Sequence, residues 1–413
     1  MKFAKLSLAA IAAMGITTSG MALDLTKSLS NVSVKTKLYY ETVDHDYPNA
    51  PDLFDQDASS GQALVQIGTQ GNFNSCWGYG VEYSVADTLG LENNLVSNTR
   101  MGASPQDGTI LDTQDWLSQA YITFRGCGTA LDKTTFKIGR QYLDTPLAFT
   151  ETWNLAPNSF DAIVAMNSDI QNVTVVGAYI GKGNGIFGRV TKGQQFTNYV
   201  VDGAYALGLL TNFGVPVNVW YYNVLKIADA WWADTKIDLG PAKLGLQYGN
   251  MSPKGSGDDS SGGAVSLSGS VAGFNLMAAY SKMDDDGALA LANTATGFKK
   301  TKLATAGIYT DGTGVAIPGS KAYKFKVSTK TPIGKLTAQY VSCENDSATN
   351  TAFQNGMTNV DEVDLVLGTK VLGINTKLIY INRDVDTAYE IKTPAGGLKH
   401  DTQHVRVVLS KNF

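Results

Sequence analysis

The sequence predicts an all-β fold, a transmembrane antiparallel β-barrel of about 18 strands. First, the chain holds 43 Gly and 19 Tyr, while only 17% of its 413 residues are charged. Second, it divides into segments of roughly ten residues in which polar and apolar side chains alternate. Third, the connections alternate between long and short, because successive connections of a closed antiparallel barrel lie at opposite ends. We therefore expect long outer loops, short periplasmic turns and a single barrel domain over residues 23–413.

The first residues predict export. Lys2 and Lys5 precede an apolar run, and a segment of small residues follows it and ends at Ala22. This order is typical of a secretory signal peptide, here residues 1–22, and the apolar run is short for a membrane helix, which needs about 20 residues. Together with the strand pattern, it predicts the outer membrane of a Gram-negative cell, after cleavage near Ala22.

The alternating segments define the expected strands in chain order. Typical long connections are 88–114 and 284–319, and typical tight ones are 271–273 and 371–373. The eighteen predicted strands are 31–44, 60–71, 76–87, 115–126, 134–143, 159–167, 171–180, 195–207, 215–225, 227–238, 241–250, 262–271, 273–283, 320–331, 333–343, 359–370, 373–383 and 401–413.

The segment KAYKFKVSTK decides which face of the wall meets lipid. Every second residue gives Tyr323, Phe325 and Val327 on one face, with Lys324 and Lys326 on the other. A lysine that faces lipid at mid-bilayer costs about 2 to 4 kcal/mol. The lysines of this strand are therefore predicted to face a water-filled lumen.

The same parity rule gathers further cations on one continuous wall, because the last strand closes on the first. The predicted basic ladder is Lys35, Lys37, Lys324, Lys326, Lys330, Lys335, Lys370, Lys377, Arg383 and Arg406. The middle strands place Asp202, Asp234 and Asp238 on the opposite wall. Walls of opposite charge concentrate and orient carboxylate or dipolar solutes. The alternative interpretation is that lumen residues are polar only because they are wet.

One stretch, KIGRQYLDTPLAFTETWNLAPNSFDAIV at 137–164, resembles the OprD family of substrate-selective outer-membrane porins. The matching elements are Gly-Arg-Gln at 139–141, Leu-Asp-Thr-Pro-Leu at 143–147 and Pro-Asn-Ser-Phe-Asp at 157–161. The resemblance implies an eighteen-stranded barrel, a third outer loop folded inward, a basic ladder, and uptake of small carboxylates or amino acids. Two features differ from the family pattern: the residues before the Pro-Asn pair are Asn-Leu-Ala rather than including an arginine, and the ladder is mostly lysine.

On this chain the inward loop is expected at about 144–158, with prolines near both ends that restrict the backbone. The predicted constriction residues are Arg140, Asp144, Glu151 and Asp161. Strict alternation sends Arg140 toward lipid, so its role requires a bulge near Gly139. The alternative is an ordinary ordered surface loop.

The three cysteines predict no metal site. Cys76 and Cys127 are expected at the periplasmic ends of adjacent strands, where either a disulfide or two free thiols fits the sequence. Cys343 is expected at the other end and single. No spacing resembles a metal site.

The predicted function is passive diffusion of small anionic or zwitterionic solutes, with no cofactor. Expected partners are solutes in transit and outer-membrane lipid, while a net charge of −4 gives no indication of nucleic acid. A monomer and a loose homotrimer both remain open. The alternatives are a non-specific general diffusion porin and a structural or adhesive barrel whose mouth is covered by 284–319. An enzyme is not expected, because the chain has 3 His and no nucleophile motif.

Overall fold

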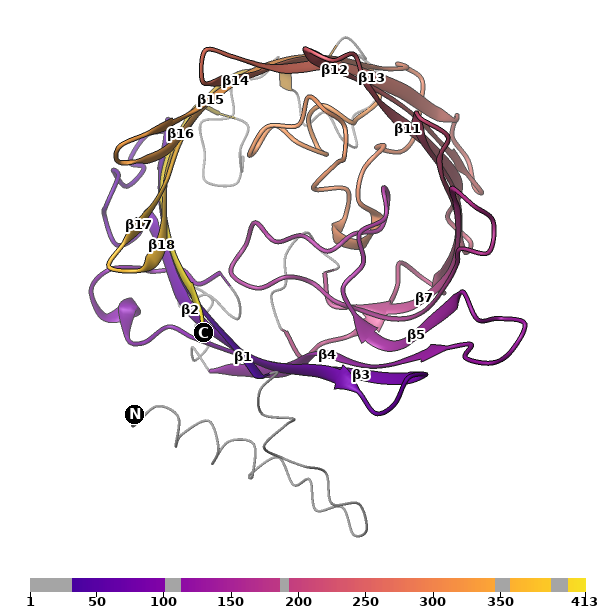
Figure 1. Cartoon of the computed structure of the whole chain (residues 1–413). Helices are drawn as coiled ribbons and strands as arrows, with labels where there is room; N and C mark the ends of the chain where they lie inside the picture. The colour runs from indigo at the N-terminus through magenta and orange to yellow at the C-terminus, as the bar shows by residue number, and fades with distance from the viewer. Residues whose placement is uncertain (1–31, 101–112, 186–192, 346–356, 388–399) are drawn as a thin grey trace.

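The computed structural model describes residues 32–100, 113–185, 193–345, 357–387 and 400–413. The predicted signal peptide and its cleavage near Ala22 lie outside these residues. Within them, the chain forms a ring of tilted antiparallel strands that encloses two inward loops (Figure 1).

The structure has long strands and very little helix among the described residues. Two short 3-10 helices are present, η2 (Leu91–Asn93) and η4 (Thr294–Thr296). The strands are β1 (Val32–His45), β2 (Ser59–Asn72), β3 (Trp77–Asp87), β4 (Gln114–Arg125), β5 (Thr134–Gln141), β6 (Phe160–Asn167), β7 (Val173–Gly183), β8 (Thr197–Asn198), β9 (Ala204–Asn212), β10 (Pro216–Val224), β11 (Ala228–Asp238), β12 (Ala242–Pro253), β13 (Ser260–Val271), β14 (Phe274–Met283), β15 (Ser320–Thr331), β16 (Gly334–Asn345), β17 (Met357–Val371), β18 (Ile374–Thr387) and β19 (Thr402–Asn412).

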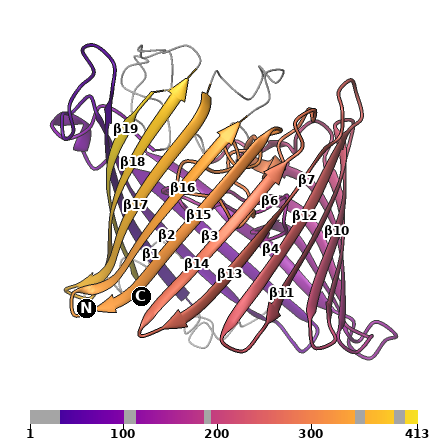
Figure 2. The ribbon, with the colours of Figure 1, turned by 90° about the horizontal axis from the view of Figure 1, so that it is seen from above.

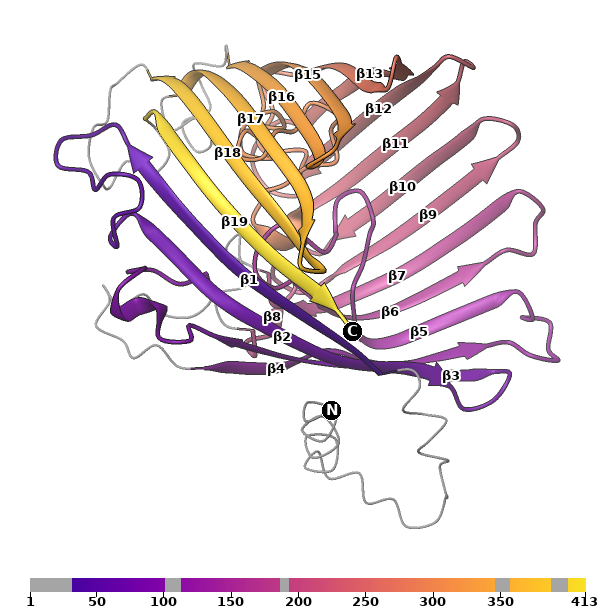
Figure 3. The ribbon, with the colours of Figure 1, turned by 60° about the vertical axis from the view of Figure 1, so that its left-hand side comes forward.

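The ring closes through its first and last strands. β1 pairs with β2 on one edge and with β19 on the other, both antiparallel, as Figure 3 shows. Among the described residues, β8 pairs with β7 alone and stands outside the ring, which leaves eighteen strands in the closed barrel. The predicted fold class and strand number are confirmed.

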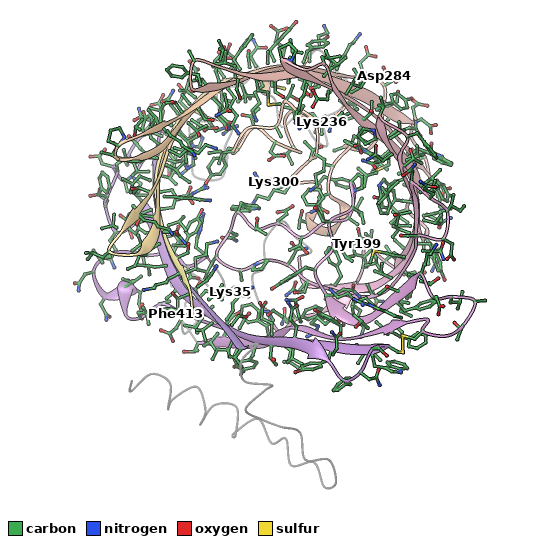
Figure 4. All side chains as sticks on the ribbon, viewed as in Figure 1. Lys35, Tyr199, Lys236, Asp284, Lys300 and Phe413 are labelled. Atoms are coloured by element: carbon green, nitrogen blue, oxygen red, sulfur yellow. A yellow bond between two sulfur atoms is a disulfide. The ribbon has the colours of Figure 1, made fainter. Side chains whose placement is uncertain are left out.

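One predicted strand, 195–207, is misplaced. The ring strand begins at Ala204, and the preceding residues form a turn in which Val200 has φ 55° and Gly203 has φ 100°. Positive φ values interrupt an extended strand, and they reset which side chains face inward. With Asp202 predicted in the lumen, alternation over 195–207 places Tyr199 on the lipid face, but Tyr199 is instead buried inside the ring (Figure 4).

The two ends of the barrel differ in their connections. Figure 2 shows the barrel from the side, with long loops at the upper end and short turns at the lower end. The turn between β17 and β18 is only Leu372 and Gly373, whereas the loop between β14 and β15 covers residues 284–319. Outer-membrane barrels carry their short turns on the periplasmic side, so the lower end is taken as periplasmic.

The outer face of the wall is apolar and the inner face is polar. Tyr323, Phe325 and Leu365 are exposed on the outside, while Lys324 points inward and contacts an inner loop. Alternation places these side chains, because successive residues of a strand face opposite sides of the sheet. Among the described residues, no helix is long and apolar enough to cross a membrane.

Two loops fill part of the ring, as Figure 1 shows. We call residues 142–159, between β5 and β6, the constriction loop, and residues 284–319, between β14 and β15, the inner loop. Leu147 of the first and Leu291 of the second pack into one buried cluster with Trp232 of β11. The hydrophobic core of this protein therefore lies inside the barrel, against the wall formed by β6 to β14.

A disulfide joins Cys76 and Cys127 at the short-turn end, with their Cα atoms 5.6 Å apart. It ties the turn before β3 to the turn after β4. Cys343 is a free, buried cysteine on the inner face of β16.

Candidate functional site

The constriction loop and the inner loop are joined by a hydrogen-bonded seam. The side chain of Asn293 donates to the Phe149 carbonyl at 2.9 Å and to the Glu151 carboxylate at 3.0 Å. The Thr294 amide donates to the Leu147 carbonyl at 2.9 Å. The seam places both loops as one unit in the lumen.

Glu151 belongs to this seam and does not line the pore, which corrects its predicted role. Its carboxylate accepts from the Trp153 indole at 2.7 Å and from the Thr296 hydroxyl. Burial raises the pKa of Glu151 above its ordinary value, although these hydrogen bonds oppose the shift.

A cavity of about 650 Å³ lies between the seam and the wall formed by β1 and β2. Asp144 and Lys302 meet there at 2.5 Å, one from each loop, and the Asp144 side chain is 83% exposed while that of Lys302 is 39% exposed. Other lining residues include Lys35, Lys37, Gln66, Tyr142 and Thr152. The cavity thus contains a constriction-loop carboxylate, an inner-loop ammonium and two ammonium groups of the barrel wall.

The two lysines of β1 that line the cavity also bind neighbouring parts of the barrel and the constriction loop. Lys35 forms an ion pair with Glu82 of β3 at 2.9 Å. Lys37 donates to the carbonyls of Thr152 and Asn154, so it fastens the constriction loop to the wall. Lys35 keeps 44% of its side chain exposed, which leaves it accessible to a solute in the cavity.

Five lysines of the predicted ladder are exposed on inner-face positions of β15 to β18. None of them forms an ion pair with a described residue. They are Lys326, Lys330, Lys335, Lys370 and Lys377. Lys330 and Lys335 face each other across β15 and β16 next to the short turn, so the run extends to the periplasmic end.

The other three ladder residues are buried, which corrects their predicted accessibility. Lys324 donates to the Ala306 carbonyl of the inner loop. Arg383 lies 3.7 Å from Glu362, and Arg406 lies 2.8 Å from Glu41. These cations are covered by the inner loop, so a solute in the lumen does not reach them.

Sequence reasoning missed the acids on this wall. They are Glu41, Glu82, Glu362 and Asp364, all buried on the inner face. The signal was present, because Glu41 has the same parity as Lys37 and therefore shares its face.

Glu362 and Glu41 fix the inner loop to the wall. The carboxylate of Glu362 accepts from the backbone amides of Ile308, Tyr309 and Thr310 at 2.5, 3.1 and 2.6 Å. The Tyr309 hydroxyl donates to the Glu41 carboxylate, which also accepts a hydrogen bond from the Arg406 guanidinium. The upper part of this wall is consequently a structural ion-pair network.

The opposite acidic wall is smaller than predicted. Asp234 faces the lumen and accepts from the Trp232 indole at 2.9 Å. Asp238 lies at the periplasmic end, 3.9 Å from Lys243. Asp202 is not on the wall, because it lies in the turn before β9, 2.5 Å from Lys226.

Arg140 and Asp161 pair with each other and are not among the residues that line the cavity. The guanidinium makes two hydrogen bonds to Asp161, at 2.8 and 3.1 Å, and lies 3.3 Å from the Phe196 ring centroid. Gly139 has φ 121°, a value outside the extended range, so the strand is irregular where a bulge was expected. The pair fastens β5 to β6, and its role in the constriction stays a prediction.

The site chemistry is that of ionic contacts with small solutes. Among the described residues, no group of three or more His, Cys, Asp or Glu side chains is placed to hold a metal ion. The cavity offers ammonium, carboxylate, hydroxyl and amide groups. Such groups bind charged solutes weakly and reversibly in water.

Comparison with known proteins agrees with this architecture. The model of the family described as Campylobacter major outer membrane protein matches residues 1–183. Pseudomonas aeruginosa OccK9 (OpdG) is 16% identical with a TM-score of 0.70, covering 93% of this chain and 98% of that one. The chain has an OprD-type barrel fold. Acinetobacter baumannii OccAB1 gives 15% identity, a TM-score of 0.68 and coverage of 93% and 96%. No curated protein sequence matches.

The OprD-type fold confirms the expected resemblance at the level of architecture. Pseudomonas aeruginosa OccD3 (OpdP) is another such neighbour, at 14% identity and a TM-score of 0.66, with 93% of this chain and 91% of that chain covered. At these identities the likeness concerns the fold, and the side chains of the pore are this chain's own.

Proposed function

We propose that this OprD-type barrel is an outer-membrane porin that passes small anionic or zwitterionic solutes by diffusion. The observation that carries the proposal is the cavity that contains Lys35, Lys37 and Lys302, followed by exposed lysines toward the periplasmic end. The apolar outer face supports a position in the membrane.

The lysines on the periplasmic side of the constriction give this part of the wall a positive charge that attracts anions. Lys326, Lys370 and Lys377 are exposed and unpaired among the described residues, so their charge is not cancelled locally. A wall of one sign raises the local concentration of opposite charge, and weak contacts let the solute leave as easily as it enters. The solved structure of Pseudomonas aeruginosa OpdK contains vanillate, a small carboxylate, and shares this fold at 12% identity with a TM-score of 0.68.

The direct test is the reversal potential of the purified protein in a planar bilayer under a salt gradient. Lys326→Glu combined with Lys377→Glu should move the wild-type anion preference toward cations. Lys133→Glu, on a periplasmic turn, is the matched control and should leave it unchanged. A cation-selective wild type, or no shift in the double variant, would overturn the role of the lysines.

A general diffusion porin is the competing function, and it predicts rates set by solute size alone. Uptake into proteoliposomes of propionate, β-alanine and propionamide, a neutral solute of the same size as propionate, separates the two. Higher rates for the carboxylates than for the neutral solute support the proposal, and equal size-limited rates contradict it.

A further inference from the structure

The short turns at the periplasmic end carry an unusual set of exposed apolar side chains. Of the eight periplasmic turns, all of them within the described residues, six have a large apolar residue that is more than half exposed. We call this set the rim residues: Phe73, Ile170, Phe213, Leu239, Ile333 and Leu372. Turns that lie in water favour Gly, Asn, Asp and Ser.

Leu372 shows that turn geometry does not explain the set. It has φ 51° and is 94% exposed, in a two-residue turn with Gly373. Such turns favour Asn or Asp at this position, because a branched side chain is strained at positive φ. Leucine here is unfavourable both for the backbone and for an aqueous surface.

The opposite end of the barrel provides the comparison. The short turn between β10 and β11 also has a positive-φ residue, at φ 63°, but there it is Lys226, whose side chain is 71% exposed. Positive φ alone does not select the residue type, because Ala272 meets the same requirement at the periplasmic end and Leu89, at φ 57°, meets it in an outer loop. The distinguishing feature of the periplasmic end is therefore that six of its eight turns carry a large exposed apolar residue.

The rim residues continue the apolar outer belt without a break. Phe274, Leu336 and Val371 are exposed apolar residues on the lipid-facing side, within three residues of their turns. Figure 2 shows these strand ends and turns together along the lower edge. A belt that reaches the last strand residues places the turns at the level of the lipid headgroups.

We propose that the rim residues insert into the inner leaflet of the outer membrane, so that the periplasmic turns anchor the barrel in lipid. The partner is a phospholipid surface, whose acyl boundary accepts apolar side chains and whose headgroups solvate the turn backbones. This inference rests on the membrane position of the proposed porin and adds a lipid-binding surface at its periplasmic end.

The test uses single thiols labelled with an environment-sensitive fluorophore in vesicles with acyl-brominated lipid. The introduced thiol is the reactive one, because Cys76 and Cys127 are bridged and Cys343 is buried. Leu372→Cys and Phe213→Cys should give blue-shifted emission that the bromolipid quenches. Phe54→Cys, an exposed apolar position in an outer loop, should show neither effect.

A label at Phe325→Cys, on the lipid-facing belt, distinguishes failure of the rim anchor from failure of the membrane position of the barrel. Quenching at Phe325 without quenching at the two turns overturns the rim anchor alone. No quenching at Phe325 overturns the membrane position itself. A second measurement is the urea midpoint for extraction from vesicles, which Leu372→Asn should lower although Asn suits the turn. A midpoint equal to or above wild type contradicts the anchor, and Lys226→Asn is the control.

Discussion

The hydroxyl of Tyr309 on the inner loop donates a hydrogen bond to the carboxylate of Glu41 on β1. Glu41 is buried and Tyr309 is partly buried, and Arg406 donates to the same hydroxyl at 3.0 Å. The contact joins a loop to a wall strand 268 residues earlier in the chain. It therefore holds the inner loop in the lumen rather than over the mouth.

Tyr309→Phe should loosen the inner loop without unfolding the barrel. The change removes one hydrogen bond to a charged group, worth about 1.5 to 3 kcal/mol, while the Glu362 contacts to the loop backbone remain. We expect faster proteolysis of 284–319 and larger fluctuations in single-channel current. Tyr248→Phe, on the lipid face, is the control. If Tyr309→Phe and wild type gave identical current traces and proteolysis rates, the hydrogen bond between Tyr309 and Glu41 would not be what holds the inner loop.

The seam should be strongest in acid because of Glu151. Burial raises the pKa of this carboxyl group in the folded state, so the folded loops hold its proton more tightly than an unfolded loop does. The stabilisation is full below the ordinary pKa of 4.5 and is lost as the pH rises through the folded value. Proteolysis of the inner loop should therefore quicken with rising pH in this range. In Glu151→Gln this dependence should disappear, and its persistence would assign it to another group.

Lys324 and Lys326 should behave differently although they lie two residues apart. Lys326→Met should lower anion selectivity, since its ammonium is exposed in the lumen. Lys324→Met should leave selectivity close to wild type and loosen the inner loop, because its ammonium binds the Ala306 carbonyl. Reversal potentials of the two variants decide this, and equal shifts would show that both lysines are accessible.

The pair of Asp144 and Lys302 should set the balance between anions and zwitterions. Asp144→Asn removes an exposed carboxylate from the cavity, so propionate uptake should rise relative to β-alanine. An exposed ion pair of this kind is worth about 0.2 to 1 kcal/mol, which corresponds to a change in the ratio of up to about fivefold. Asp52→Asn in an outer loop is the control. An unchanged ratio of propionate to β-alanine uptake would show that Asp144 does not act on solutes in the constriction.

The disulfide should stabilise the periplasmic end. It closes a sequence separation of 51 residues, and its loss through Cys76→Ser with Cys127→Ser should cost about 2 to 4 kcal/mol. The urea midpoint of the refolded barrel measures this loss. Reduction of the wild type should reproduce the effect of the two substitutions, and a midpoint that neither treatment moves would contradict it.

The barrel could be predicted because each strand carries its own signal. Alternation in KAYKFKVSTK places Tyr323 and Phe325 outside and Lys324 inside, as the structure has them. The strand around Ala204 was misplaced because positive φ at Val200 leaves no trace in the polarity pattern.

The inner loop could not be predicted, because its position depends on distant partners. Asn293 reaches Phe149 across 144 residues, and Gln247 of β12 bonds to the Lys302 carbonyl across 55. No local periodicity encodes such contacts. The buried acids differ in this respect, since the parity that placed Lys370 also places Glu362 and Asp364 on the inner face.

The seam between Leu147 and Thr294 has a consequence for biogenesis. Leu147 lies in the constriction loop between β5 and β6, whereas Thr294 lies in the inner loop after β14. The seam is therefore incomplete until the later strands have been synthesised and paired. A partly assembled barrel would hold an unsupported constriction loop in an open ring. We therefore expect the complete constriction to form only when the ring closes.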